Sequence, residues 1–120
     1  MKHTRDVYAT ASGDRNDCSV RSLATAACLP YDDAHAAFAK HGRKSGRKTP
    51  TSVTAKVVKD FFPHAQSVKG GITLNRFVAA YPVGHFVVHV RGHALAVCDG
   101  VVHDWKPGQR RQVRWAWRIC

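Results

Sequence analysis

The last third of the chain carries the pattern that most restricts its fold, a series of strand-like runs joined by very short turns. Arg91-Gly92 and Asp99-Gly100 each separate two apolar, β-branched runs by two residues, which is the spacing of a β-hairpin turn. A further run follows a break at Lys106-Pro107-Gly108. We therefore expect an antiparallel sheet with strands over 85–90, 93–98, 101–105 and 112–119.

The first two thirds of the chain show helical spacing and helix boundaries instead. Apolar residues recur at intervals of three and four, and the runs end at Pro30, Gly42, Pro63 and Pro82. Residues 1–15 are expected to be irregular. The predicted helices cover about 18–28, 34–40, 53–61 and 74–80. The chain is thus predicted to be a single α+β domain over 1–120, with N-terminal helices packed on a C-terminal antiparallel sheet.

The charge of the chain is strongly positive. There are 19 Lys and Arg residues against 8 Asp and Glu residues, a formal net charge of +11. This balance favours an acidic partner, namely nucleic acid, a negatively charged protein or an anionic surface, although it also favours simple solubility. No zinc-finger or RRM signature is present. The candidate anion-binding residues are Arg43, Lys44, Arg47, Lys48, Arg110 and Arg111.

The tryptophans near the C-terminus favour a core role over base stacking. Residues 113, 115, 117 and 119 are all apolar, while Arg114 and Arg118 lie between them, so Val113, Trp115, Trp117 and Ile119 are expected on one buried face of a strand.

The cysteines and the lack of long apolar runs indicate the compartment. No run is long enough to cross a bilayer, and the N-terminus leads into no apolar segment typical of a signal peptide. Four scattered cysteines without CxxC spacing suggest reduced thiols and a cytoplasmic protein, in the host cytoplasm if the chain is phage-encoded. Cys28 and Cys98 are expected to be small buried hydrophobes.

The histidines do not predict a metal centre, and no cofactor is expected. His85, His89 and His93 are evenly spaced. The Arg91-Gly92 turn, however, places the first two on the opposite sheet face from the third, and zinc needs clustered ligands.

Cys18 is the first candidate for chemistry because of its place at the start of a helix. At about 100° per residue, it falls nearly opposite the apolar stripe that contains Val20, Leu23 and Ala24. The free N–H groups and positive dipole end of a helix favour a thiolate there. The same N–H groups can hydrogen-bond a developing oxyanion.

The predicted hairpins add a base and an acid. If Asp99-Gly100 is a two-residue turn, His93 and Asp104 are diagonal neighbours on one face of adjacent strands. A carboxylate in this position would fix the imidazole tautomer and stabilise the imidazolium. Asp99 lies at the turn, too far along the strand to take this role.

These segments together resemble the small papain-like cysteine peptidase domains of phage and bacteria. The bacteriocin-leader peptidases and ovarian-tumour deubiquitinases share the same broad fold. The similarity rests on residues 14–23 (DRNDCSVRSL), 92–97 (GHALAV) and 99–104 (DGVVHD), and the first is loosely similar to the Asp-Gly-Asn-Cys box of the deubiquitinases. The resemblance implies a papain-like fold, with Cys18 as nucleophile, His93 as general base and Asp104 as its orienting residue.

One departure from that pattern concerns the oxyanion. Many members carry a Gln several residues before the cysteine, whereas here Gln66, Gln109 and Gln112 all follow it. Asn16 is the candidate replacement, together with the Cys18 backbone N–H.

Two functions remain open. One is a cysteine-dependent hydrolase that cleaves a peptide, isopeptide or other acyl bond in an acidic substrate. The alternative is a non-catalytic basic module that binds nucleic acid or an acidic host protein.

Overall fold

The computed structural model describes residues 2–4, 17–44, 49–103 and 112–120. Within these ranges it has four helices, α1 Cys18–Ala27, α2 Tyr31–Lys40, α3 Thr51–Phe61 and α4 Leu74–Ala80. The strands there are β1 Lys2–Thr4, β2 Gln66–Lys69, β3 His85–Val90, β4 His93–Cys98, β5 Val101–His103 and β6 Val113–Arg118. The predicted α+β class is therefore confirmed. None of the described helices is long and apolar enough to span a membrane.

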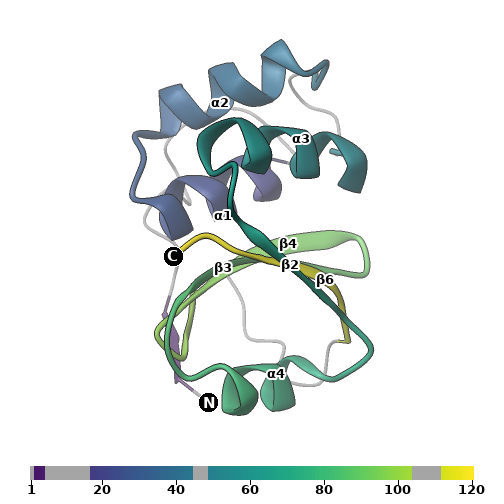
Figure 1. The fold of residues 1–120 in the computed structure, drawn as a ribbon. Helices are drawn as coiled ribbons and strands as arrows, with labels where there is room; N and C mark the ends of the chain where they lie inside the picture. Colours follow the sequence, from purple (N-terminus) through teal and green to yellow (C-terminus); the bar gives the residue numbers. More distant parts are fainter. Residues whose placement is uncertain (1, 5–16, 45–48, 104–111) are drawn as a thin grey trace.

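The strands form one sheet in the order β1-β5-β4-β3-β6-β2, with helices on both faces. Figure 1 shows α1, α2 and α3 on one face and α4 alone on the other. Both predicted hairpins are confirmed, because Val90 pairs with His93 and Cys98 pairs with Val101. Asp99 adopts φ 49° and Gly100 φ 79°, as a tight turn with two left-handed residues requires.

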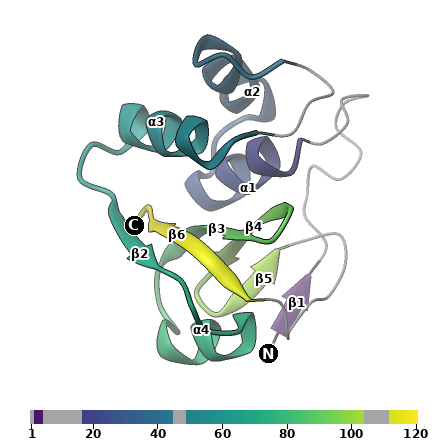
Figure 2. The ribbon, with the colours of Figure 1, turned by 90° about the vertical axis from the view of Figure 1, so that its right-hand side faces the viewer.

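Two strands were not predicted from the sequence. Residues 1–15 were expected to be irregular, but Lys2–Thr4 forms β1, which pairs in parallel with β5 at the sheet edge (Figure 2). Strand β2 pairs antiparallel with β6 at the other edge. Both strands are short, with three and four residues, so neither carries enough alternation to be recognised.

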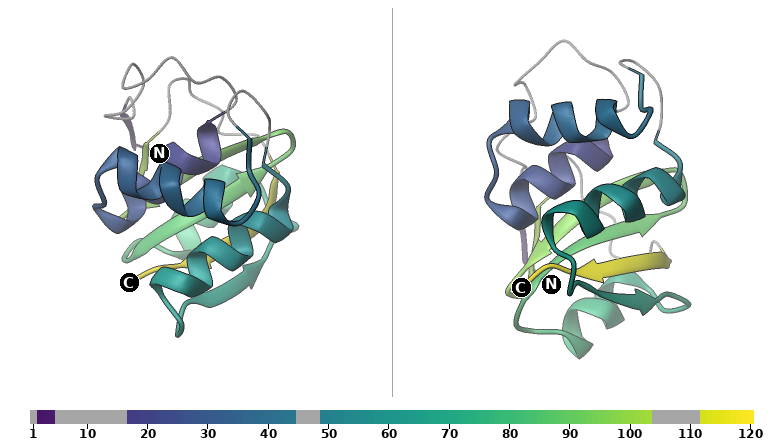
Figure 3. Two further views of the ribbon diagram at one scale, coloured as in Figure 1. Left: turned by 90° about the horizontal axis from the view of Figure 1, so that it is seen from above. Right: turned by 45° about the horizontal axis from the view of Figure 1, so that its top comes forward.

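The sheet separates two hydrophobic cores. The larger lies under α1, α2 and α3, and α1 packs directly between α2 and the sheet (Figure 3). Its largest fully buried side chains include Phe38 and Leu23. The smaller core lies under α4, where Phe77 meets Phe86 edge to face with ring centroids 5.2 Å apart.

A β-bulge in β6 corrects the predicted face of Val113. His89 pairs with Trp115 while the next residue, Val90, pairs with Val113, so Arg114 is an extra residue in the ladder. Trp115 and Trp117 face the larger core as predicted, but Val113 belongs to the core under α4. The bulge reverses the alternation between residues 113 and 115.

A buried polar cluster fixes the start of α1. The Asp17 carboxylate contacts Arg21 Nε at 2.9 Å and accepts a hydrogen bond of 2.7 Å from the Tyr31 hydroxyl. Asp17 is 4% exposed, and Arg21 and Tyr31 are each 8% exposed. Because buried charges must be paired and hydrogen-bonded, this cluster ties the first turn of α1 to α2.

Replacing Tyr31 with Phe tests this tie. The change leaves one oxygen of Asp17 without its donor, and we expect a loss of about 1–3 kcal/mol in the free energy of unfolding. Urea denaturation followed by circular dichroism measures it. Tyr81→Phe is the matched control, because Tyr81 packs on Phe77 and Phe86 through its ring, and it should change stability by less than about 0.5 kcal/mol. Equal effects of the two substitutions would contradict a role for the Tyr31 hydroxyl.

Candidate active site

The structure brings two of the predicted site residues together. Cys18 is the first residue of α1 and His93 is the first residue of β4, and these two elements pack against each other. The Cys18 thiol and the His93 side chain are within hydrogen-bonding distance. One helix–strand contact thus brings together two residues that are 75 positions apart in the sequence (18 to 93).

The surroundings of Cys18 favour its thiolate. Burial alone would raise the pKa of this thiol, but the hydrogen bond with His93 and the charge of His93 act in the opposite direction. A backbone hydrogen bond from Ala94 and the charge of Arg21 act in the same direction as His93. Together they hold the pKa of Cys18 below its ordinary value of 9.0. This is the environment of a reactive rather than a structural cysteine.

Arg21 was not recognised as part of the site from the sequence. It lies three residues after Cys18, which places both on the same side of the first turns of α1. The Asp17 carboxylate holds its guanidinium, so its charge stays beside the thiol. The spacing of 17, 18 and 21 is the sequence signal that could have found it.

The side on which Cys18 lies differs from the helical-wheel expectation. Seven residues of α1 are buried, among them polar Ser19 and Ser22, because the helix lies between α2 and the sheet. The helix therefore has no broad solvent face opposite its apolar stripe. Cys18 is instead partly exposed at the helix end.

A small cavity of about 130 Å³ opens between the start of α1 and the turn of the β3–β4 hairpin. Cys18, His93 and His89 line it, together with Thr49 and Thr51. The first α-helical hydrogen bond of α1 runs from Arg21 N to Asp17 O, so the earlier N–H groups have no acceptor within the helix. The cavity thus combines a thiol, an imidazole and a helix N-terminus.

His89 is a member of this cavity that the sequence analysis placed apart from His93. The predicted register is confirmed, since His89 pairs with Ala94 and Val90 with His93. Even so, both histidines line the cavity at the end of the hairpin. His89 is 7% exposed, and burial followed by the charge of His93 lowers its pKa to about 4.

Asp104 and Asn16, the predicted orienting acid and oxyanion donor, lie outside the described residues. The β4–β5 register that underlies the Asp104 prediction is present up to the pairing of Ala96 with His103.

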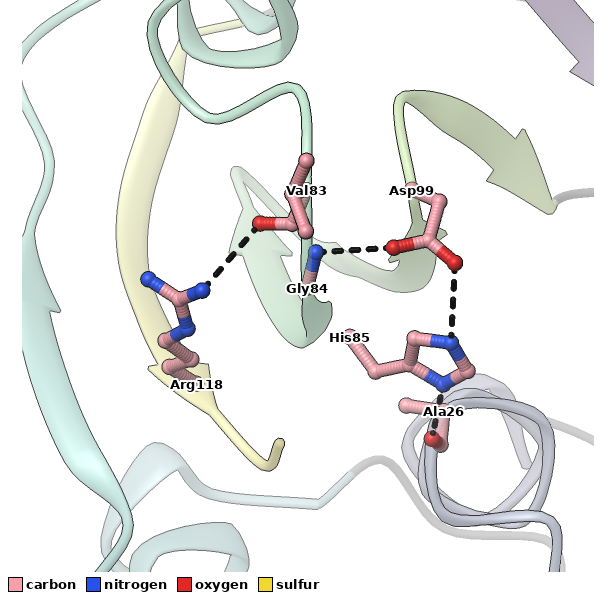
Figure 4. Close-up of polar contacts among 6 residues, drawn as sticks. All are labelled: Ala26, Val83, Gly84, His85, Asp99 and Arg118. Carbon is pink, nitrogen blue, oxygen red and sulfur yellow. Dashed lines mark hydrogen bonds and ion pairs between the residues drawn. The ribbon is translucent and has the colours of Figure 1, made fainter.

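Asp99 follows β4 at the end away from His93, and its carboxylate contacts a different histidine, His85. Its carboxylate accepts a hydrogen bond of 2.9 Å from Gly84 N and lies 3.5 Å from His85 Nε2, while His85 Nδ1 meets Ala26 O at 2.8 Å (Figure 4). The Gly84 hydrogen bond, followed by His85, holds the pKa of Asp99 below its usual range. This cluster joins the Asp99-Gly100 turn to α1.

The other thiols have different surroundings. Cys28 was expected to be buried but is exposed, because it ends α1 in the left-handed conformation. Burial, with the neighbouring Cys28, Asp99 and Cys120, raises the pKa of Cys98 to about 12. Cys98 is therefore an inert thiol in the same chain as Cys18.

The predicted basic surface is only partly described. Arg43 was expected to bind anions at the surface, but it is 6% exposed, so it belongs to the interior where the chain leaves α2. Lys44 is exposed. Arg47, Lys48, Arg110 and Arg111 lie outside the described residues.

A larger groove of about 510 Å³ adjoins the small cavity. Helix α3 forms one wall and strands β2 and β6 form the other, with Trp115 and Trp117 among the lining residues. Thr51 lines both hollows. Lys56 and Lys59 also line the groove, so a positively charged, partly aromatic hollow leads toward Cys18.

Within the described ranges, no three His, Cys, Asp or Glu side chains are placed to bind one metal ion.

The lowered pKa of His89 predicts an acid-sensitive contribution to stability. The unfolded chain takes up this proton near pH 6.5, whereas the folded chain resists it until about pH 4. Stability therefore falls as the pH drops through this window, by about 3 kcal/mol at its lower end. In His89→Leu, urea unfolding at pH 7 and pH 4 should show a correspondingly smaller loss. His64→Leu, at an exposed position, is the control and should keep the wild-type difference. An unchanged acid loss in His89→Leu would contradict the assignment.

Comparison with known protein families, curated proteins and solved structures found no match to this chain.

Proposed function

We propose that this protein is a cysteine-dependent hydrolase of the papain-like type, acting on a peptide, isopeptide or other acyl bond. The observation that carries the proposal is the pairing of Cys18 with His93, in which the thiol pKa is lowered although burial alone would raise it. A nucleophile within reach of a base is the arrangement that covalent catalysis needs.

The reaction proceeds through a thioester. Cys18 Sγ attacks the acyl carbon, and protonated His93 donates its proton to the leaving group as the scissile bond breaks. His93 then takes a proton from water, which attacks the thioester and releases the acid and the free thiol. Asp104 is proposed to orient His93, as the resemblance to papain-like peptidases implies.

The papain-like assignment is supported by the layout. The nucleophile begins a helix, the base begins a strand of an antiparallel sheet, and the helix packs on that strand. The order Cys, His, Asp along the chain is the same as in the papain-like group.

An acidic substrate segment fits the adjoining groove. Lys56 and Lys59 supply positive charge on α3, while Trp115 and Trp117 supply apolar surface on β6. A net charge of +11 further attracts acidic substrates.

The second candidate function is a non-catalytic basic module that binds nucleic acid or an acidic host protein. The specific observation in its favour is that same net charge of +11, with Lys44 exposed in the segment that follows α2. A thiol with a lowered pKa has no part in this function, so the reactivity of Cys18 separates the two proposals.

Alkylation by iodoacetamide, followed cysteine by cysteine by mass spectrometry between pH 5 and pH 9, tests the hydrolase proposal. Because the pKa of Cys18 is lowered, its rate should stay high below the range of an ordinary thiol. Cys98 should remain slow throughout, because its pKa is about 12. His93→Ala should shift the Cys18 profile to higher pH.

His64→Ala is the matched control for that experiment, since it removes an exposed histidine and should leave the Cys18 profile unchanged. If Cys18 titrates like the exposed Cys28 and Cys120 and ignores the loss of His93, the hydrolase proposal is wrong.

Salt dependence tests the binding module. A fluorescent single-stranded oligonucleotide should bind at 50 mM salt and lose at least about tenfold in affinity by 200 mM, because phosphate contacts release counterions. Lys44→Glu should weaken this binding. An affinity that does not change with salt, or an absence of binding at 50 mM, counts against the module.

A further inference from the structure

The groove beside the Cys18 cavity has the size and the accessibility of a ligand site. Its volume is about 510 Å³, within the range of about 300–1,000 Å³ that is usual for ligand pockets. Helix α3 forms one wall, and strands β6 and β2 at the edge of the sheet form the other (Figure 2). Ser52 of α3 and Ser67 of β2 line the groove and are exposed, so a bound chain can enter it from solvent.

The length of the groove can be measured from the Cys18 cavity. Thr51, the first residue of α3, lines both hollows. The lining residues of α3 extend from Thr51 to Lys59, a distance of about 12 Å at 1.5 Å per residue. An extended peptide covers this distance with about four residues. A polypeptide bound at Cys18 can therefore fill the groove with about four residues on one side of the bond that is attacked.

The α3 wall carries positive charge that faces no carboxylate of the groove. Lys56 and Lys59 both line the groove and both are exposed. Among the described residues that line it, none is acidic. The carboxylate of Asp60, the acidic residue of α3, instead contacts His41 at the end of α2. An anionic occupant therefore complements this wall.

The sheet wall is apolar and offers little surface for stacking a base. Trp117 is 5% exposed, and Trp115 packs against the same core. The ring of Trp117 also packs edge to face on His89. Base stacking needs a free ring face, whereas an aliphatic side chain can pack on any exposed part of a ring. This wall therefore favours a peptide over nucleic acid.

The two opposing walls select an alternating pattern of side chains. Successive side chains of an extended chain point in opposite directions, so alternate residues of a bound segment face α3 and the sheet. Residues two apart lie about 6.6 Å from each other. Lys56 and Lys59 are about 4.5 Å apart along the helix axis, and their long, flexible side chains can reach two such positions.

We propose that the groove binds a substrate segment with the pattern acidic–apolar–acidic, two to four residues from the bond that Cys18 attacks. This inference rests on the proposed hydrolase function and identifies its substrates as acidic polypeptides. The two acidic side chains pair with Lys56 and Lys59, and the apolar side chain between them packs on Trp115 and Trp117.

Iodoacetyl peptides test this placement without requiring turnover. One probe carries the iodoacetyl group at the N-terminus of the peptide Ala-Asp-Leu-Asp. A second carries it on a diamine at the C-terminus of the reversed peptide, so the two cover both chain directions. In each case Cys18 Sγ displaces iodide and forms a thioether. Comparison probes contain Arg in place of both Asp residues, or Ser in place of Leu.

The rate of Cys18 alkylation by each probe is divided by the rate with iodoacetamide, which removes differences in thiol reactivity. At low salt, one of the two acidic probes should react about tenfold faster than its Arg counterpart. It should also react about fivefold faster than its Ser counterpart, because a leucine side chain gains free energy on burial. Mass spectrometry identifies the modified cysteine.

Charge reversal in the groove should change this preference. Lys56→Glu combined with Lys59→Glu should abolish the preference for the acidic probe or reverse it in favour of the Arg probe. Lys40→Glu combined with Arg76→Glu is the matched control, because it changes the net charge equally at exposed positions outside the groove. This control should retain most of the preference. Circular dichroism checks that both variants are folded.

The outcomes separate this inference from the function on which it rests. If wild-type protein prefers neither acidic probe, or if both double variants lose the preference equally, the inference is wrong and the hydrolase proposal stands. If a single-stranded oligonucleotide protects Cys18 from the probe and the unlabelled peptide does not, the occupant is nucleic acid and the inference is wrong.

A binding measurement covers failure of the hydrolase proposal itself. That proposal fails if Cys18 reacts with iodoacetamide no faster than the exposed Cys28. Fluorescence anisotropy of a fluorescein-labelled Ala-Asp-Leu-Asp peptide with Cys18→Ala then tests the groove alone. Binding that is weakened by the Lys56 and Lys59 substitutions, and not by the control pair, supports the groove as a site for acidic peptides. An absence of binding overturns it.

Discussion

The contact between the start of α1 and the start of β4 is the constraint on which the candidate site depends. It brings the Cys18 thiol to His93, and the resulting hydrogen bond and charge outweigh the burial that would otherwise keep the thiol protonated. Asp17 stabilises this contact, because its carboxylate binds both Arg21 of α1 and the Tyr31 hydroxyl of α2. The same cluster therefore positions α1 and places a guanidinium beside the thiol. The side chains that hold α1 in place thus also lower the pKa of the Cys18 thiol, through the charge of Arg21.

The small cavity and the larger groove lie next to each other and share the lining residue Thr51. The small cavity is lined by Cys18 and His93, and the larger groove is lined by α3, β2 and β6. Thr51, the first residue of α3, is common to both. Helix α3 thus carries positive charge along the groove and reaches the cavity of Cys18 at its N-terminus.

Much of the fold was predictable because the strong elements carry local signals. Pro and Gly at helix ends, helical spacing, and two-residue turns gave close boundaries for α1, α3, α4, β3 and β4. The same turns predicted the β4–β5 register. The parallel edge strand at Lys2–Thr4 was missed because three residues bear no periodic pattern and the partner lies about 100 positions away. The predicted face of Val113 was wrong because the alternation of apolar and polar residues does not reveal a bulge.

The site was predictable in part for related reasons. Cys18 and His93 stand at the ends of recognisable elements, so their meeting followed from the helix start and the hairpin turn. His89 was predicted on the opposite sheet face from His93, and the strand register agrees with this. Alternation did not reveal that both residues line one cavity, because a cavity at the end of a hairpin receives side chains from both faces. Arg43 was predicted at the surface because it begins a run of basic residues. Its burial depends on the packing around α2, which the local sequence does not show.

The bulge at Arg114 makes β6 a structural link between the two sides of the sheet. On one side of it Val113 packs with the α4 layer, and on the other Trp115 and Trp117 line the groove. A change of side-chain volume beneath the sheet therefore moves the backbone that carries the groove tryptophans. Substitutions in the α4 layer can therefore alter the shape of the groove without changing any residue that lines it.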